Sequence, residues 1–131
     1  MTKNGAQVLG TNEVWTEVPG WAADSAGYPG SVVVGNGLRA NGSSSNAAIT
    51  ATLPFGSAGM SGNHQARLVL NGTTVLGTGA VVTGTSGTMT AAATVSLSDG
   101  DIVTVQVWHN ISFQMWRATI TAGAGTFVRI T

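Results

Sequence analysis

The sequence predicts an all-β fold, a single antiparallel β-sandwich or jelly roll of about eight to ten short strands. Three observations predict it. Apolar residues alternate with small or polar residues along much of the chain, which is the period of a strand with two different faces. Val, Ile and Thr fill these segments, as pleated sheets favour. Turn-forming residues separate the segments at short intervals, and no segment has convincing helical periodicity.

The expected strands follow one another from residue 14 to residue 130. The clearest alternation lies in residues 88–97 and in residues 102–108, where Val103 and Val105 face away from Thr104. The other segments with strand character are residues 14–18, 31–34, 47–53, 65–70, 73–76, 115–121 and 126–130.

Turn residues lie between these strands. Asn71-Gly72 is the strongest short signal for a hairpin, and Ser98-Asp99-Gly100-Asp101 separates the two clearest strands. Asn36-Gly37 and residues 122–125 mark further turns. No linker or repeat divides the chain. We therefore expect residues 1–8 to form an N-terminal arm and residues 9–131 to form one jelly-roll domain.

The composition is small, hydroxyl-rich and neutral. Gly, Ala, Thr and Ser make up nearly half of the 131 residues, and five basic residues balance five acidic ones. Zero net charge argues against a nucleic-acid partner, which Lys and Arg would have to bind. It also removes the repulsion that keeps monomers apart, so a homo-oligomer is expected. No signal peptide or membrane span is visible, so we expect synthesis in a cytoplasm and no membrane partner.

The residues that carry chemistry are too few or too scattered for an enzyme. The chain has no Cys and lacks the Gly-x-Ser-x-Gly motif of serine hydrolases. Asp99 and Asp101 flank a turn glycine, and His64 and His109 have no further strong metal ligands beside them. Gly77-Thr78-Gly79 lacks the downstream sequence of a phosphate loop. We therefore predict no catalytic residue, no cofactor and no metal.

Aromatic residues indicate contact surfaces instead. Trp15 shares a strand face with Glu13 and Glu17, which favours a rim or an interface over a core centre. Protein interfaces are enriched in aromatic residues, Met and Arg. Trp108, Phe113 and Trp116 are expected in a subunit interface or in a tight core cluster. The four arginines have two interpretations, outward solvated positions or pairs across a subunit contact: Arg39, Arg67, Arg117 and Arg129.

The order of features resembles the jelly roll of the tumour-necrosis-factor and complement globular-head superfamily. Residues 35–39 followed by 47–53 look like the paired early strands of that fold, and residues 67–75 look like its central hairpin. Residues 95–105 are similar to its strand, Gly-Asp turn and strand, and residues 126–130 match its last core strand. Ala48-Ile49-Thr50 stands where the complement heads usually have Tyr and Phe. The resemblance therefore implies the architecture rather than close kinship.

The Gly/Ala/Thr-rich style also resembles small virion proteins of tailed bacteriophages, particularly those of high-GC actinobacteria. It is carried by residues 15–21 and by Gly27-Tyr28-Pro29-Gly30. Such jelly rolls assemble as trimers, either as capsid decoration proteins or as heads of tail fibres. Only a short segment precedes the first strand signal here, so a decoration protein is expected rather than a fibre. It would be made in the host cytoplasm and would sit on the virion surface.

This resemblance implies a homotrimer that binds the major capsid protein on the outside of the head and stabilises the shell. The expected contact residues lie at the N-terminus and around two tryptophans: Thr2, Lys3, Asn4, Gln7, Trp15 and Trp21. The alternative is a minor tail or tail-fibre head domain that recognises a host surface glycan through Trp15, Trp108 and Asn110.

Overall fold

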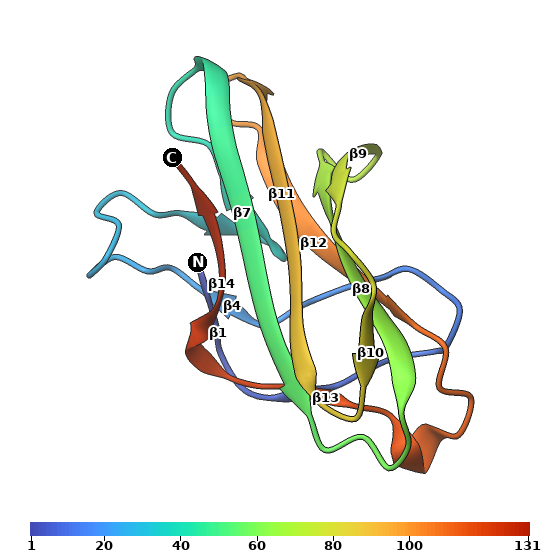
Figure 1. The fold of residues 1–131 in the computed structure, drawn as a ribbon. Coiled ribbons are helices and arrows are strands. Elements are labelled where there is room, and N and C mark those ends of the chain that lie inside the picture. Colours follow the sequence, from blue (N-terminus) through green and yellow to red (C-terminus); the bar gives the residue numbers. More distant parts are fainter.

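The computed structural model describes residues 1–131 as two antiparallel β-sheets that face each other (Figure 1). The first, which we call the β7 sheet, consists of β1 (Thr2–Lys3), β2 (Gln7–Val8), β4 (Trp21–Ala22), β7 (Ser44–Gly56), β11 (Gly87–Leu97), β13 (Thr119–Ile120) and β14 (Gly123–Ile130). The second, the β12 sheet, consists of β3 (Thr16–Glu17), β5 (Val33–Val34), β6 (Gly37–Arg39), β8 (Gly62–Leu70), β9 (Thr74–Thr78), β10 (Val82–Gly84) and β12 (Ile102–His109). The predicted all-β antiparallel sandwich is confirmed.

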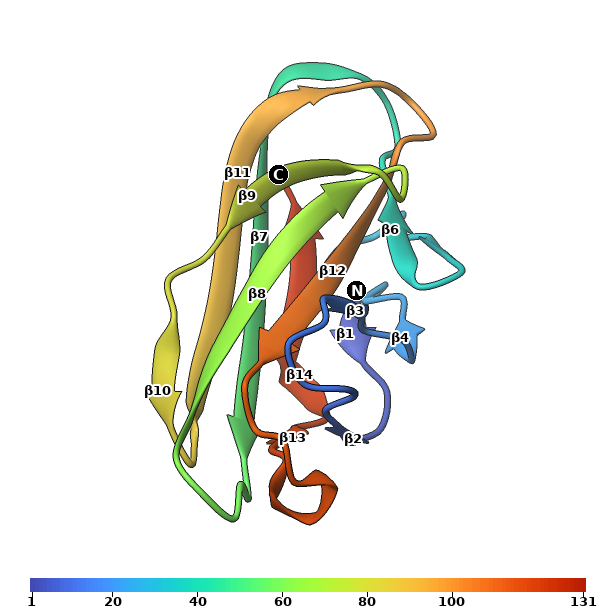
Figure 2. The same ribbon diagram turned by 90° about the vertical axis from the view of Figure 1, so that its right-hand side faces the viewer.

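Long strands form the centre of each sheet. β7 pairs with β11 along one edge and with β14 and β13 along the other, whereas β8 pairs with β12. In Figure 2, β8 and β12 pass in front of β7 and β14. Strand alternation explains the packing, because Ile49, Leu53 and Met89 point inward and are fully buried. Together with Val103 and Val105 from β12 they form part of one core cluster between the sheets.

The predicted turn at Asn71-Gly72 has the expected geometry. Asn71 and Gly72 both have positive φ angles, 49° and 76°, which is what a tight hairpin between β8 and β9 requires. Residues 98–101 connect β11 to β12, but these strands belong to different sheets. That turn therefore leads the chain across the sandwich. The β5–β6 hairpin turns at Gly35-Asn36, one residue earlier than predicted.

The predicted strand at residues 115–121 is wrong. Gln114–Trp116 forms a 3₁₀ helix (η1), and only Thr119–Ile120 (β13) is paired as a strand. The chain leaves the β12 sheet at His109 and must cross to the β7 sheet, so this stretch has no neighbouring strand to pair with. The strand at 14–18 is similarly reduced to Thr16–Glu17, because Glu13 has a φ of 58° and breaks the extended backbone.

The number of strands is also larger than expected. Fourteen are present, six of them only two residues long, so the short strands at the edges exceed the predicted eight to ten. Periodicity cannot find a two-residue strand, because alternation needs at least four residues to be visible.

Residues 1–8, expected as an arm, supply two short strands of the β7 sheet. β1 pairs with β14 and with β4, and β2 pairs with β13. Met1 is buried, and its amino group donates a 2.8 Å hydrogen bond to the Val128 carbonyl. These backbone contacts attach the segment to the domain in the isolated chain.

Candidate functional site

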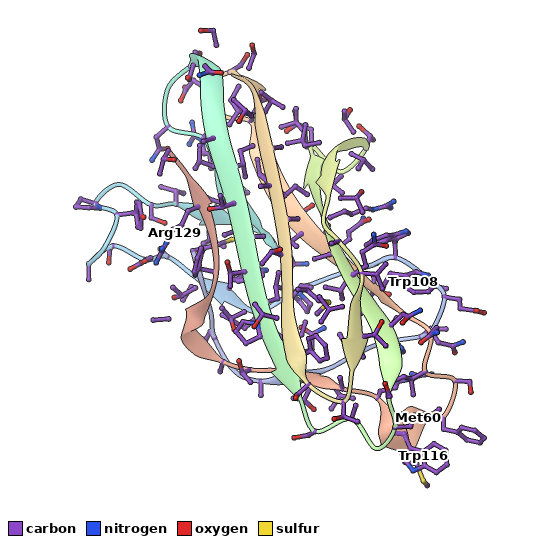
Figure 3. The ribbon with its side chains drawn as sticks, in the orientation of Figure 1. Met60, Trp108, Trp116 and Arg129 are labelled. Carbon is purple, nitrogen blue, oxygen red and sulfur yellow. The ribbon has the colours of Figure 1, made fainter.

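Four large apolar side chains are exposed together at one end of the sandwich. We call this cluster the end patch, and it consists of Met60, Phe113, Met115 and Trp116. Met115 is 83% exposed and Phe113 is 58% exposed. The Phe113 and Trp116 rings contact each other with centroids 4.7 Å apart. Figure 3 shows Met60 and Trp116 side by side at this end, far from Trp108 and Arg129.

Local structure presents the end patch. Ile111 is buried and anchors the chain after β12, and η1 then turns Met115 outward. The Trp116 ring lies against Gly59, where an added Cβ would be only 2.4 Å from the Trp116 Cδ1 atom. Gly59 also donates its N–H to the Trp116 carbonyl at 3.0 Å. The patch is thus held between two loops that are distant in sequence.

The outer face of β7 and β11 is a second surface of uniform chemistry. We call it the threonine face, and it consists of Thr50, Thr52, Thr88, Thr90, Ala92 and Thr94. Thr90 lies opposite Thr52 and Ala92 lies opposite Thr50, so these small side chains form adjacent rows. No charged residue belongs to this face. Thr104, which sequence alternation assigns to a similar outer face on β12, is instead buried, and its hydroxyl has no hydrogen-bond partner.

The expected contact residues of the N-terminus differ in exposure. Asn4 is exposed, and Thr2 and Gln7 are partly buried within short strands. Lys3 is only 5% exposed, and its Nζ donates to the carbonyl of Gly5 at 3.1 Å. Burial lowers the pKa of the Lys3 ammonium. Of these four residues, only Asn4 is exposed.

The tryptophans fall into three environments. Trp21 is buried, and its Nε1–H donates to the Val18 carbonyl at 2.6 Å. Trp15 is half-buried on the outside of the β12 sheet, where the Arg67 guanidinium lies 4.3 Å from its ring centroid. Trp108 lies opposite Gln65 on the outer side of that sheet. Phe113 and Trp116 belong to the end patch, so the structure separates Trp108 from the two aromatics grouped with it.

The polar residues that suggested chemistry have structural partners. Asp101 accepts hydrogen bonds from the Asn71 side chain and from the Ser98 N–H, and these lower the pKa of its carboxyl. Asp99 accepts the Gly42 N–H and lies 3.9 Å from Arg39. Asn110 accepts the Asn63 N–H. These side chains fix the loops at the ends of the sandwich.

His64 and His109 are buried next to each other, with ring centroids 6.3 Å apart. The His109 Nε2–H can donate to the Gly10 carbonyl at 2.8 Å, while its Nδ1 accepts the Ile111 N–H at 3.2 Å. His64 has no partner on either ring nitrogen and lies against Phe55. Burial lowers the pKa of both imidazoles. This arrangement fits two neutral core histidines.

Sequence reasoning does not find Met60 as part of a surface. Its only signal is an apolar residue between Gly59 and Ser61, where a loop would ordinarily carry polar side chains. The sequence also fails to identify Met115 as a surface residue, because alternation assigns it to a strand that does not form.

No group of three or more His, Cys, Asp or Glu side chains is placed to hold a metal ion. None of the helical structure has the length and apolar character needed to cross a membrane. Comparisons with protein-family models and with curated proteins found no match to the chain.

Proposed function

We propose that this protein is a capsid decoration protein of a tailed bacteriophage, a homotrimeric jelly roll that binds the major capsid protein on the outside of the head. Its role is structural rather than enzymatic, and it uses no cofactor and no nucleic acid. A protein that binds only the assembled shell stabilises that shell by mass action.

Strand order supports the jelly-roll part of this proposal. The chain passes repeatedly between the sheets, from β2 to β3, β3 to β4, β4 to β5, β6 to β7, β7 to β8, β10 to β11, β11 to β12 and β12 to β13, while β1 lies beside the final strand β14. Jelly rolls likewise join the strands of two antiparallel sheets by more than successive hairpins within one sheet.

The end patch is the observation that carries the proposal. Soluble monomers seldom expose contiguous large apolar side chains, and the cores of protein interfaces favour aromatic residues and Met. Phe113, Met115 and Trp116 follow one another around η1 and project from one end of the sandwich. We assign this end to the capsid. The threonine face, flat and uncharged, is suited to the contact between subunits.

Met115 provides the sharpest test, because its side chain touches little of its own chain. Met115→Glu is expected to fold normally and to lower the occupancy of purified heads about tenfold or more, since binding would have to bury a charge where a methionine was buried. Val75→Glu is the matched control, an exposed apolar residue paired with the end of β8 that lies away from Met60. Equal occupancy for Met115→Glu and the unmodified protein would refute capsid attachment through this end.

A glycan-recognition role in the tail is the second candidate, and one observation favours it. On the outer side of the β12 sheet, Arg67 connects two possible sugar contacts. Its guanidinium covers Trp15, and its Nε–H donates to Gln106 at 2.8 Å. Aromatic faces and amides together suit sugar binding. Immunogold labelling of the tail with glycan-array binding that Trp15→Ala abolishes would favour this function over decoration.

A further inference from the structure

A cavity of about 340 Å³ opens between the start of β7, the end of β14 and the loop at residues 28–31. This volume lies at the lower end of the range for small-molecule sites, about 300–1,000 Å³. β1 covers the edge of β14 only as far as the Val128 N–H, which donates to the Met1 carbonyl. The last residues of β14 therefore contribute an uncovered strand edge to the cavity wall.

Two buried polar atoms in this wall have no partner. The Arg129 Nε–H and the Ser31 hydroxyl are both inaccessible to solvent and make no hydrogen bond. A buried donor without a partner costs about 1–3 kcal/mol, so such groups are usually satisfied by something. Both residues line the same cavity, so a ligand placed there could satisfy both donors once the two side chains rotate toward it.

The Arg129 guanidinium is held in position by aromatic rings. Its Cζ lies 3.8 Å from the Phe127 ring centroid and 5.1 Å from that of Tyr28. Figure 3 shows the side chain extending from β14 toward the loop between β4 and β5. A guanidinium fixed in this way presents a planar pair of donors, which matches the two oxygens of a carboxylate.

The two charged side chains that line the cavity, Arg39 and Arg129, are both basic. Asp99 lies 3.9 Å from Arg39 but outside the lining, and Arg129 has no carboxylate within ion-pair distance. The opposite wall is fixed, because the Asn41 side chain donates to the Gly30 carbonyl.

We propose that this cavity binds a small hydroxylated carboxylate of the sugar-acid class. Arg129 binds the carboxylate, and the Ser31 hydroxyl binds a hydroxyl group of the ligand. The site is separate from the end patch, so the proposal does not depend on capsid attachment. Arg129 lies opposite Thr50 on the neighbouring strand, so the site borders the threonine face.

Amide chemical-shift titration with D-glucuronate tests this proposal, with D-glucose as the neutral sugar of the same ring. Glucuronate is expected to give saturable shifts at Ser31, Arg39 and Arg129, and glucose to bind at least about tenfold more weakly. Arg129→Gln should weaken glucuronate binding about tenfold or more. Arg129→Lys should also weaken it, because Lys lacks the planar fork.

Ser31→Ala changes no charge, and Ser31 lies outside the core. This variant therefore tests glucuronate binding even if the arginine variants do not fold. It should weaken glucuronate binding several-fold. Arg117→Gln removes an arginine that does not line the cavity, so it is the matched control and should bind like the unmodified protein. Three results would overturn the proposal: no saturable shift at the cavity, equal binding of glucose, or undiminished binding by folded Arg129→Gln and Ser31→Ala variants.

Discussion

His64 and His109 show how single residues limit the conditions in which this fold is stable. Both imidazoles are buried within the sandwich, and burial lowers the pKa of each because the charged form loses its hydration. His109 must also keep Nδ1 unprotonated to accept the Ile111 N–H. The folded state therefore binds fewer protons than the unfolded chain in mildly acidic solution.

We predict that the free energy of unfolding falls as the pH is lowered. The histidine contribution is complete above the unfolded pKa of about 6.5 and is lost progressively as the pH falls from there through the lower folded pKa values. The slope of the free energy of unfolding against pH should reach up to about 1.4 kcal/mol per pH unit for each histidine. Urea denaturation at a series of pH values measures it.

His64→Leu and His109→Leu separate the two contributions. Leu at position 64 replaces a ring without hydrogen bonds, so it should be tolerated and should reduce the slope. Leu at position 109 leaves the Gly10 carbonyl and the Ile111 N–H unpaired, which should cost about 1–3 kcal/mol. A pH-independent free energy of unfolding in the unmodified protein would contradict the histidine account.

At the scale of elements, Gly77 and Gly79 decide how closely the two sheets approach at one edge. Gly77 lies in β9 and Gly79 just after it, and both lie against the backbone of β11. An added Cβ at Gly79 would be 1.6 Å from the Thr90 carbonyl oxygen, and one at Gly77 would be 2.3 Å from that of Ala92. These two positions must therefore be glycine because β11, which is distant in the sequence, leaves no room for a side chain.

Gly79→Ala is therefore expected to destabilise the protein by about 1–3 kcal/mol or more, because the backbone after β9 or that of β11 must move. Gly125→Ala is the control, since a Cβ there would meet nothing within 4 Å and the residue lacks a positive φ. It should be neutral or stabilising by about 0.4–1 kcal/mol. Thermal unfolding compares the two variants. Similar melting temperatures would show that β11 and the segment after β9 can move apart at little cost.

The same scale shows which elements a sequence can predict. Residues 88–97 and 102–108 are predicted well because their alternation covers many residues and one face is buried. Residues 115–121 have similar β-branched and aromatic character, but no strand is available beside Met115. Strand formation depends on a pairing partner, which periodicity does not identify.

At the scale of the whole molecule, the distribution of charge sets how copies of the chain can meet. The threonine face spans two long paired strands and has no charged residue. Its side chains are small, so another sheet can pack closely against it. The end patch faces a different direction. Two separate surfaces of this kind allow one molecule to contact both its own copies and a larger assembly.

Thr94→Arg tests the subunit contact. If trimers form through the threonine face, a long cation there should convert the trimer to monomer, because a like-charged and poorly hydrated cluster would result. Thr74→Arg makes the same change at an exposed strand position on the β12 sheet and should leave the mass unchanged. Light scattering coupled to size-exclusion chromatography measures both. A monomeric unmodified protein, or a trimeric Thr94→Arg variant, would exclude this contact.

The sequence by itself determined the fold class, the principal long strands and the hairpin at Asn71-Gly72, because alternation and turn preferences act over neighbouring residues. Only the tertiary structure decided which surfaces exist. It buried Trp21 and Lys3, exposed Met115, and brought Met60 beside Trp116. It also placed Ser31 and Arg129 in one cavity. These outcomes depend on contacts between segments far apart in the chain, and no local pattern encodes which segments meet.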